Sequence, residues 1–360
     1  MNFVISMDLH RWGYSCLAEN RQPPDGVARQ LLGQGHKFIH VDMDSYFVAV
    51  ELLDAPWLRE RPVAVGGKAT DRGVISTSNY IARRYGVRSG MATATAERLC
   101  PGLVLLPVRF ERYEAVTRRL DVIFRRYTSN VEFLSLDEAT LDVTGQVYCN
   151  GSATYMANRI RASIEQKLHL TASAGVAPLK YLAKMASEVN KPNGQFVIAP
   201  HQVQAFLKNL DIRKIPGVGP KTWAVLQALG CTKCADVTDE MIPALLRHLG
   251  AHGFYVWERC RGQESYEGKP GAVQSLGVEH TLPSDCNDFA CCLRELDELL
   301  GTLAKRLEVL GSAPPIVRNQ VKLKFSDFSI ATAEAPALAL QPQVVRGLCR
   351  MLWDLSLIHI

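Results

Sequence analysis

Acidic side chains occur at two separate places in predicted strands, and together they could bind divalent metal ions. Asp42 and Asp44 end the β-rich stretch that starts at Lys37, and Asp137 and Glu138 lie inside a stretch that alternates like a β-hairpin. Adjacent residues on a regular strand face opposite ways, so Asp137 and Glu138 must lie near the hairpin turn if both are to converge with Asp42. Three carboxylates held together in an apolar sheet repel one another, and a divalent cation relieves that cost.

The type of ligand limits which metals could bind and which reactions they could support. Oxygen ligands favour Mg²⁺, Mn²⁺ or Ca²⁺ over zinc. Two such ions about 4 Å apart form a clamp for in-line phosphoryl transfer, in which one ion activates the attacking hydroxyl and the other neutralises the leaving group. The alternative is that the acids cap turns on a solvated surface. From the residues alone both interpretations stay open.

Strands and helices alternate around these acids. Apolar residues recur at helical spacing in the predicted helices and alternate in the predicted strands. This order predicts one α+β sheet domain, with a segment over 56–107 inserted into it. The predicted elements are strands over 37–44, 62–67, 73–77 and 170–176, a hairpin over 131–143, and helices over 45–53, 79–85, 109–127, 153–168 and 179–188.

The second half of the chain changes pattern twice. Residues 210–262 are helical in pattern, and the polar, glycine-rich stretch 264–272 predicts a linker. A strand over 274–282 begins a new unit, and a helix, a hairpin and a second helix follow it. A closing strand would normally cover such a sheet, so we expect this unit to be truncated or to carry an unrelated tail.

Composition sets wide limits on function. The chain has 360 residues, of which 47% are hydrophobic, and a formal net charge of +5, which permits a polyanionic partner without requiring one. No stretch of about 18 apolar residues predicts a membrane helix. Residues 1–35 lack the apolar core of a signal peptide, and we expect a poorly ordered leader that carries no chemistry.

We predict that the ten cysteines are reduced, mostly buried thiols of a cytoplasmic protein. Cys100, Cys291, Cys292 and Cys349 stand in apolar or helical contexts. Cys231 and Cys234 have the C-x-x-C spacing of a zinc or redox site. Because no second ligand pair follows at a fitting distance, we favour ordinary packing there.

Several separated motifs resemble those of the Y-family DNA polymerases. They occur in the family's order between about residues 36 and 353, which makes the resemblance specific. The motifs are VDMDSYF at 41–47, ISTSNY at 75–80 with Ala82 and Arg83, SLDEA at 135–139, ASAGVA at 172–177 and NKPNG at 190–194.

The resemblance implies a multidomain α+β fold of the right-hand polymerase type. Its parts are a ferredoxin-like palm, small fingers, a helical thumb with a helix-hairpin-helix, and an α/β little finger that is incomplete. The implied boundaries are 36–45 and 109–198 for the palm, 46–108 for the fingers, 199–264 for the thumb, 265–272 for a linker and 273–360 for the little finger.

The resemblance also implies the catalytic residues. Asp42, Asp137 and Glu138 match the family's metal ligands, and the backbone carbonyl of Met43 joins them to hold two Mg²⁺ ions. Asp44 is not a ligand in the family pattern and is expected to support the turn.

Four further residues match nucleotide contacts of the family. Tyr80, Arg83 and Lys191 fall on positions that contact the triphosphate, where two cations and a hydroxyl offset phosphate charge. Phe47 falls on the steric-gate position, where a bulky ring favours dNTP over NTP. Taken alone, Arg83 would be a solvated helix residue, Lys191 a turn residue and Phe47 a core aromatic.

Two segments have the chemistry to hold primer-template DNA. The stretch 215–219 with Gly217, Gly219 and the following Lys221 resembles a helix-hairpin-helix, whose glycines let the backbone approach phosphates. Lys322 and Lys324 share a face of the predicted C-terminal hairpin and would contact phosphates in a salt-dependent way. The alternatives are a plain glycine turn and a solvated sheet face.

The implied function is a low-fidelity, translesion DNA polymerase of DNA repair and damage tolerance, a mutator enzyme that adds dNTPs to a primer end. We expect a cytoplasmic monomer without a proofreading exonuclease. A sliding clamp is an expected partner of the family, although no Gln-Leu-type peptide stands at the end of this chain. The alternatives are a nucleotidyl cyclase on a similar palm and a non-catalytic DNA-binding member with a truncated end.

Overall fold

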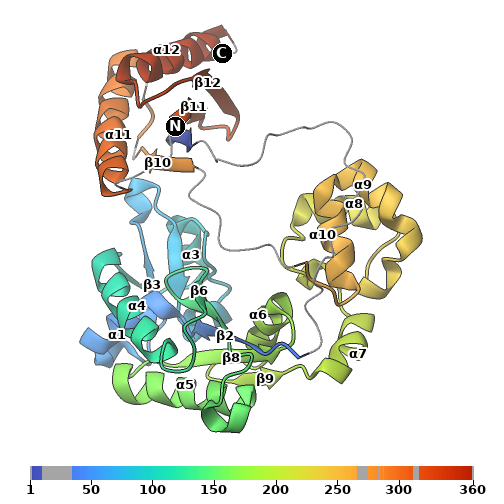
Figure 1. Ribbon diagram of the computed structural model, residues 1–360. Helices are drawn as coiled ribbons and strands as arrows, with labels where there is room; N and C mark the ends of the chain where they lie inside the picture. Colours follow the sequence, from blue (N-terminus) through green and yellow to red (C-terminus); the bar gives the residue numbers. More distant parts are fainter. Residues whose placement is uncertain are drawn as a thin grey trace.

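The computed structural model describes residues 2–9, 35–265, 275–282, 284–286, 288–310 and 316–358. Within these residues the chain forms three sheets and the helices that cover them (Figure 1). The fold class is α+β, as the sequence predicts.

The central sheet carries the predicted acids. Its strand order is β6 (Val131–Phe133), β7 (Glu138–Asp142), β2 (Phe38–Met43), β8 (Ala172–Ala177) and β9 (Gln195–Val197). Only β8 and β9 run parallel within this sheet, and the other neighbours are antiparallel.

The two faces of the central sheet are covered by different helices. Ile39 and Val41 of β2 share a buried core with helices α4 (Phe110–Phe124) and α5 (Ala153–Leu168). Phe38 instead belongs to a core with α6 (Lys180–Val189), and His40 contacts Ser187 of the same helix. Since side chains alternate along a strand, Asp42 lies on the α6 face together with His40.

A glycine lets α6 lie close to β8. A Cβ at Gly175 would stand 2.0 Å from the carbonyl oxygen of Ala183 and 2.4 Å from the amide nitrogen of Ser187. Both atoms belong to backbone, which cannot move aside without breaking the helix. Gly175 therefore sets the distance between α6 and the sheet, and with it the position of Lys184, which α6 presents to Glu138.

The inserted segment forms a second, three-stranded sheet beside the central one. Its strand order is β4 (Ile75–Ser78), β3 (Val63–Gly66) and β5 (Val104–Leu106). Helix α1 (Tyr46–Asp54) joins this sheet to β2, and Glu51 of α1 pairs with Arg109 at the start of α4. The remaining helices of this part are α2 (Tyr80–Arg84) and α3 (Thr93–Leu99).

Residues 199–265 form a helical unit that packs against α6. The hydroxyl of Tyr181 donates to the carbonyl of Arg259 at 2.7 Å, and the amide of Lys180 donates to Glu264 at 2.9 Å. These contacts fix the unit to the α6 side of the central sheet. Its helices are α7 (Val203–Lys208), α8 (Pro220–Ala228), α9 (Ile242–Leu249) and α10 (Ala251–Cys260).

The C-terminal unit contains a four-stranded antiparallel sheet with the order β10-β1-β11-β12. Two helices, α11 (Phe289–Leu310) and α12 (Pro342–Ile358), share its buried core. An ion pair between Arg72 and Asp285, 2.8 Å long, joins this unit to the three-stranded sheet. The strands are β1 (Asn2–Leu9), β10 (Ser275–Thr281), β11 (Ile316–Lys324) and β12 (Ile330–Pro336).

Strand β1 corrects two expectations. Residues 2–9 were expected to belong to a poorly ordered leader, but they pair with both β10 and β11, and Figure 1 shows the N-terminus inside the C-terminal unit. In their sequence, NFVISMDL, every second residue from Phe3 to Leu9 is apolar, and all the intervening residues except Val4 are polar, which is close to the period of a half-buried strand. The slot that a closing strand would fill is thus occupied. Residues 10–34 lie outside the described residues, and the boundaries of palm, fingers, thumb and little finger stay predictions.

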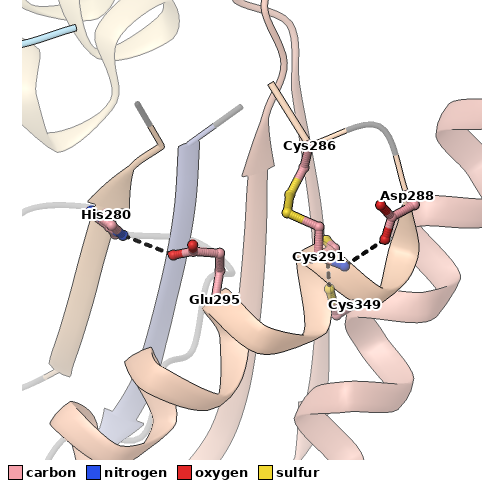
Figure 2. The surroundings of a disulfide bond; sticks show 7 residues. His280, Cys286, Asp288, Cys291, Glu295 and Cys349 are labelled. Atoms are coloured by element: carbon pink, nitrogen blue, oxygen red, sulfur yellow. Dashed lines mark hydrogen bonds and ion pairs between the residues drawn. A yellow bond between two sulfur atoms is a disulfide. The ribbon is translucent and has the colours of Figure 1, made fainter. Parts of the chain in front are cut away.

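A disulfide bond corrects a third expectation. Cys291 was expected to be a reduced thiol, but it is bonded to Cys286, with the two Cα atoms 6.0 Å apart (Figure 2). The amide of Cys291 donates to the side chain of Asp288 at 2.7 Å, and this turn at the start of α11 brings Cys291 back to Cys286. Cys231 and Cys234 are buried and free.

Candidate active site

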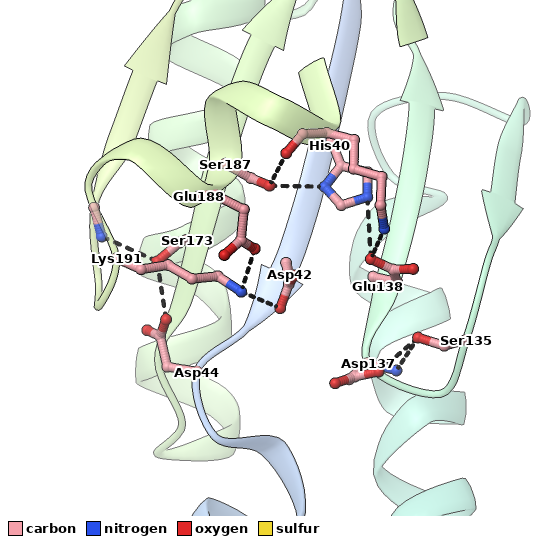
Figure 3. A network of polar contacts seen from close by, with 12 residues as sticks. His40, Asp42, Asp44, Ser135, Asp137, Glu138, Ser173, Ser187, Glu188 and Lys191 are labelled. Carbon is pink, nitrogen blue, oxygen red and sulfur yellow. Dashed lines mark hydrogen bonds and ion pairs between the residues drawn. The ribbon is translucent and has the colours of Figure 1, made fainter. Parts of the chain in front are cut away.

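The structure brings the three predicted carboxylate residues together from two distant stretches of chain. Asp42 lies directly opposite Glu138 in the antiparallel register of β2 and β7. The amide of Met43 donates to the carbonyl of Asp137 at 3.0 Å. Asp137 lies in the turn just before β7, where alternation no longer applies, so it approaches Asp42 from the side (Figure 3).

Each carboxylate has a polar partner of its own. The Nζ of Lys191 lies 2.7 Å from Asp42 and 2.7 Å from Glu188, and Lys184 pairs with Glu138. Ser135 donates to Asp137 at 2.5 Å. With these partners in place, no three His, Cys, Asp or Glu side chains among the described residues are arranged to hold a metal ion. The ammonium groups of Lys191 and Lys184 thus offset the negative charge of Asp42 and Glu138.

The donor set fits a hard divalent cation. All candidate ligands are oxygen atoms, on carboxylates and on the carbonyl of Met43, and such ligands suit Mg²⁺. Burial raises the pKa of Asp42 to about 7, although the nearby Lys191 opposes the shift. A carboxylate that is costly to keep charged in a buried site gains more from a cation than one in water.

His40 and Lys184 are two residues of this site that the sequence did not single out. His40 is fully buried, its Nδ1 lies 3.0 Å from the hydroxyl of Ser187, and its Nε2 lies 3.6 Å from Glu138. Burial, together with Lys184 and Lys191, lowers the pKa of His40 to about 3, which keeps the ring neutral. The available signal was the spacing of His40, two residues before Asp42 on the same face of the strand.

Asp44 holds the loop that carries Lys191. It is buried, and its two carboxylate oxygens accept hydrogen bonds from the hydroxyl of Ser173 at 2.9 Å and from the amide of Asn193 at 2.8 Å. These contacts match the supporting role expected for it, because they connect the end of β2 to the NKPNG loop.

Phe47 belongs to an aromatic cluster at the start of α1. Its ring stacks on that of Tyr113 with 4.1 Å between centroids, and it meets Phe110 edge-on at 5.9 Å. The hydroxyl of Tyr113 donates to Glu51, which fixes that ring. Phe47 is partly buried and rests on a rigid platform, so packing and a gate role are compatible.

Tyr80 and Arg83 lie on the short helix α2. Asn79 caps this helix by accepting from the amide of Ala82. The Arg83 guanidinium lies 4.8 Å from the centre of the Tyr80 ring, and its Nε donates to the carbonyl of Ser78. The hydroxyl of Tyr80 is buried and has no hydrogen-bond partner among the described residues. An orphaned buried donor of this kind is expected where a ligand supplies the acceptor.

The predicted helix-hairpin-helix lies before α8. Gly217 has a φ of +93°, which L side chains rarely adopt, and a Cβ there would meet ring atoms of His252 and Tyr255 at 3.2 Å. Gly219 directly precedes α8, and a Cβ there would meet nothing within 4 Å. Lys221 is exposed in the first turn of α8. The start of α8 therefore has open space at Gly219 and an exposed positive charge two residues later.

Lys322 and Lys324 lie on one face of β11. They alternate with Val321 and Leu323, which are fully buried under the helices. The two lysines thus lie on the outer face of the sheet. Arg318, on the same face, pairs with Glu334 at 2.8 Å.

Family models match three segments of the chain. The impB/mucB/samB family matches residues 41–188, the IMS family HHH motif matches 201–230, and the impB/mucB/samB family C-terminal domain matches 273–352. A curated protein from Pectobacterium atrosepticum named DNA polymerase IV is 50% identical over 88% of this chain and 91% of its own length. The chain belongs to the Y-family DNA polymerases.

Other Y-family proteins agree with this assignment. A DNA polymerase IV from Yersinia pestis is 51% identical over 83% of this chain and 85% of its own length. A Y-family DNA polymerase chimera of Dbh and Dpo4 has a TM-score of 0.77 at 27% identity, covering 88% of this chain and 94% of its own. DinB from Sulfolobus solfataricus covers the same shares with a TM-score of 0.60 at 28% identity.

The described helices include none with the length and apolar character that a membrane span requires.

Proposed function

We propose that this Y-family chain is a template-directed DNA polymerase that adds dNTPs to a primer 3′ end during low-fidelity, translesion synthesis. The observation that carries the proposal is the register of β2 and β7, which sets Asp42 against Glu138 with Asp137 beside them. Relatives that are about half identical in sequence are named DNA polymerase IV, which supports the same activity.

Two Mg²⁺ ions per site fit the carboxylates of Asp42, Asp137 and Glu138 and the carbonyl of Met43. When bound, they would supply charge neutralisation for the attacking hydroxyl and the leaving pyrophosphate. The chain also supplies positive charge to these carboxylates, because Lys191 pairs with Asp42 and Lys184 with Glu138. We infer that these lysines offset the charge of the partly buried carboxylates and hold them in place.

The nucleotide is held by the side chains around α2 and the NKPNG loop. Lys191 and Arg83 supply positive charge and Tyr80 supplies the unpaired hydroxyl, so together they suit the β- and γ-phosphates. Lys191 would then exchange its contact with Asp42 for a phosphate. Phe47, supported by Tyr113, would lie under the sugar and exclude a 2′-hydroxyl.

Primer-template DNA is held by sequence-independent contacts. Backbone amides at Gly217 and Gly219, with Lys221, suit a phosphate at the start of α8. Lys322 and Lys324 suit phosphates on the outer face of the C-terminal sheet. We further propose that the protein acts as a monomer in the cytoplasm and that a sliding clamp is its partner.

Primer extension by the purified chain, with and without Mg²⁺, tests the proposed function. We expect extension of a primed template that requires Mg²⁺ and all four dNTPs. A chain that shifts DNA in a gel but extends no primer would be a non-catalytic DNA-binding member. A template-independent cyclic product would indicate a nucleotidyl cyclase.

A further inference from the structure

Strand β1 is the only described connection between two parts of the C-terminal sheet. Strand β10 pairs with β1, β1 pairs with β11, and β11 pairs with β12. Among the described residues β10 has no other strand partner. Without β1, the sheet would therefore separate into a hairpin and a single strand, each with an open edge.

The register places β1 over the buried core of the unit. Positions 3 and 5 lie opposite Leu323 and Val321, and position 5 also lies opposite Val278 of β10. All three of these partners are buried. Directly opposed residues in an antiparallel pair share a face, so positions 3 and 5 of β1 belong to the rows that include these buried residues. A slip of one residue would put them on the outer side, which specifies the register strongly.

The same register places the other positions of β1 in the middle of the outer face. Positions 2 and 4 lie opposite Lys324 and Lys322, and position 8 lies opposite Arg318. This is the face that we propose for contact with DNA. Strand β1 thus pairs with the part of β11 that carries these basic residues, and it joins β11 to β10 in one sheet.

We propose that the gap between β10 and β11 is a strand-binding site whose occupant is residues 2–9 of the same chain. DNA binding by the C-terminal unit then depends on the N-terminus. Main-chain hydrogen bonds to two neighbours supply the affinity, and the alternating pattern supplies the register. Only the consequence for DNA binding rests on the proposed function; the occupancy of the slot does not.

A disulfide test probes the occupancy directly in the full-length chain. Ser6 lies opposite Gln320 in the register, and opposed positions on neighbouring strands are within the Cα distance of a disulfide. The double variant Ser6→Cys, Gln320→Cys is expected to form an intramolecular cross-link on mild oxidation, identified by peptide mapping. The matched control, Ser6→Cys with Thr332→Cys, places the partner one strand further away and two residues along it, at more than about 10 Å, and is expected to form none.

Each outcome of the cross-linking test either supports or overturns the proposal. Cross-linking in the first pair alone supports the proposal. No cross-link, or equal cross-linking in both pairs, overturns it. A cross-linked dimer would show that the slot takes the strand of a second copy, which overturns the assignment to the same chain.

A deletion with rescue tests the consequence for DNA binding. A chain without residues 2–9 is expected to bind primer-template DNA about tenfold more weakly, and a synthetic peptide of residues 2–9 added in trans is expected to restore the affinity. A peptide with the same residues in reversed order is the control. Unchanged affinity in the shortened chain, or a loss that neither peptide alters, overturns the dependence. The cross-link decides the occupancy even if the shortened chain fails to fold.

Discussion

The central sheet and the C-terminal sheet are both assembled from segments that lie far apart in the chain, but they reach that result differently. In the central sheet β2, β7 and β8 belong to one series of alternating strands and helices, and the site at their ends is surrounded by buried contacts. In the C-terminal sheet a strand from the beginning of the chain enters between strands from its end. A site built from one continuous series of elements can be predicted from the motifs in that series. The only sequence signal of an inserted strand is the alternation of its own residues.

The largest expected effect is on chemistry, in the central sheet. Asp137→Ala removes a carboxylate that we assign to the metal ions, so primer extension should fall by about 10³-fold or more while DNA binding is retained. Single-turnover extension and a gel shift measure the two properties. Asp142→Asn, at the far end of β7, is the control and should extend primers normally. Extension close to that of the parent chain would refute the ligand assignment.

A smaller effect is expected on sugar selection. Phe47→Ala opens the space above Tyr113, so discrimination against ribonucleotides should fall by about 10- to 100-fold. The ratio of kcat/KM for dNTP and NTP measures it. Phe110→Ala removes another ring of the same cluster and should leave the ratio unchanged. If both variants change the ratio equally, the cluster acts through packing and not as a gate.

The C-terminal sheet is expected to affect binding and not chemistry. Lys322→Gln with Lys324→Gln removes two charges from the outer face, so the slope of log affinity against log salt should decrease by about 0.9 for each lost phosphate contact. Fluorescence anisotropy at several salt concentrations measures the slope. Lys305→Gln, at an exposed position of helix α11, should leave the slope unchanged. A slope unaffected by the β11 changes would place the DNA elsewhere.

The smallest expected effect concerns a group outside both sheets. Burial raises the pKa of Glu264, which accepts from the amide of Lys180 and pairs with Arg259. The folded state therefore keeps a proton that the unfolded state loses above about pH 4.5, so this group makes the parent chain less stable as pH rises through that range. Glu264→Gln lacks this dependence, and its stability relative to the parent should increase with pH.

Urea unfolding of both proteins at several pH values between 5 and 8 measures the difference. A stability difference that stays constant or decreases as pH rises would contradict the raised pKa. The test also sharpens the comparison of the two sheets. It measures how much the junction between α6 and the helical unit contributes to stability, and it changes no residue of either sheet.

The sequence predicted most of the central sheet and its site because several signals agree there. The alternation around residues 131–143 and the position of Asp137 near a turn led to the observed approach to Asp42. Lys184 was missed because nothing in a helical stretch shows which residue its charge will meet. The opposite partner, Glu138, lies on a strand that only the folded sheet brings near.

Strand β1 was missed for another physical reason. NFVISMDL alternates apart from Val4, but such a short pattern does not show which strands it will pair with. The stretch that follows, with Pro23 and Pro24, made a poorly ordered leader the simpler interpretation. The disulfide between Cys286 and Cys291 was missed similarly, since spacing alone does not show that a turn brings two thiols together.

The course of β1 determines how the C-terminal unit can be isolated. A fragment that starts at β10 would lack an interior strand, so it should expose two unpaired edges and aggregate. A permuted gene that encodes residues 2–9 after α12, joined by a short glycine-rich linker, would supply all four strands in one contiguous piece.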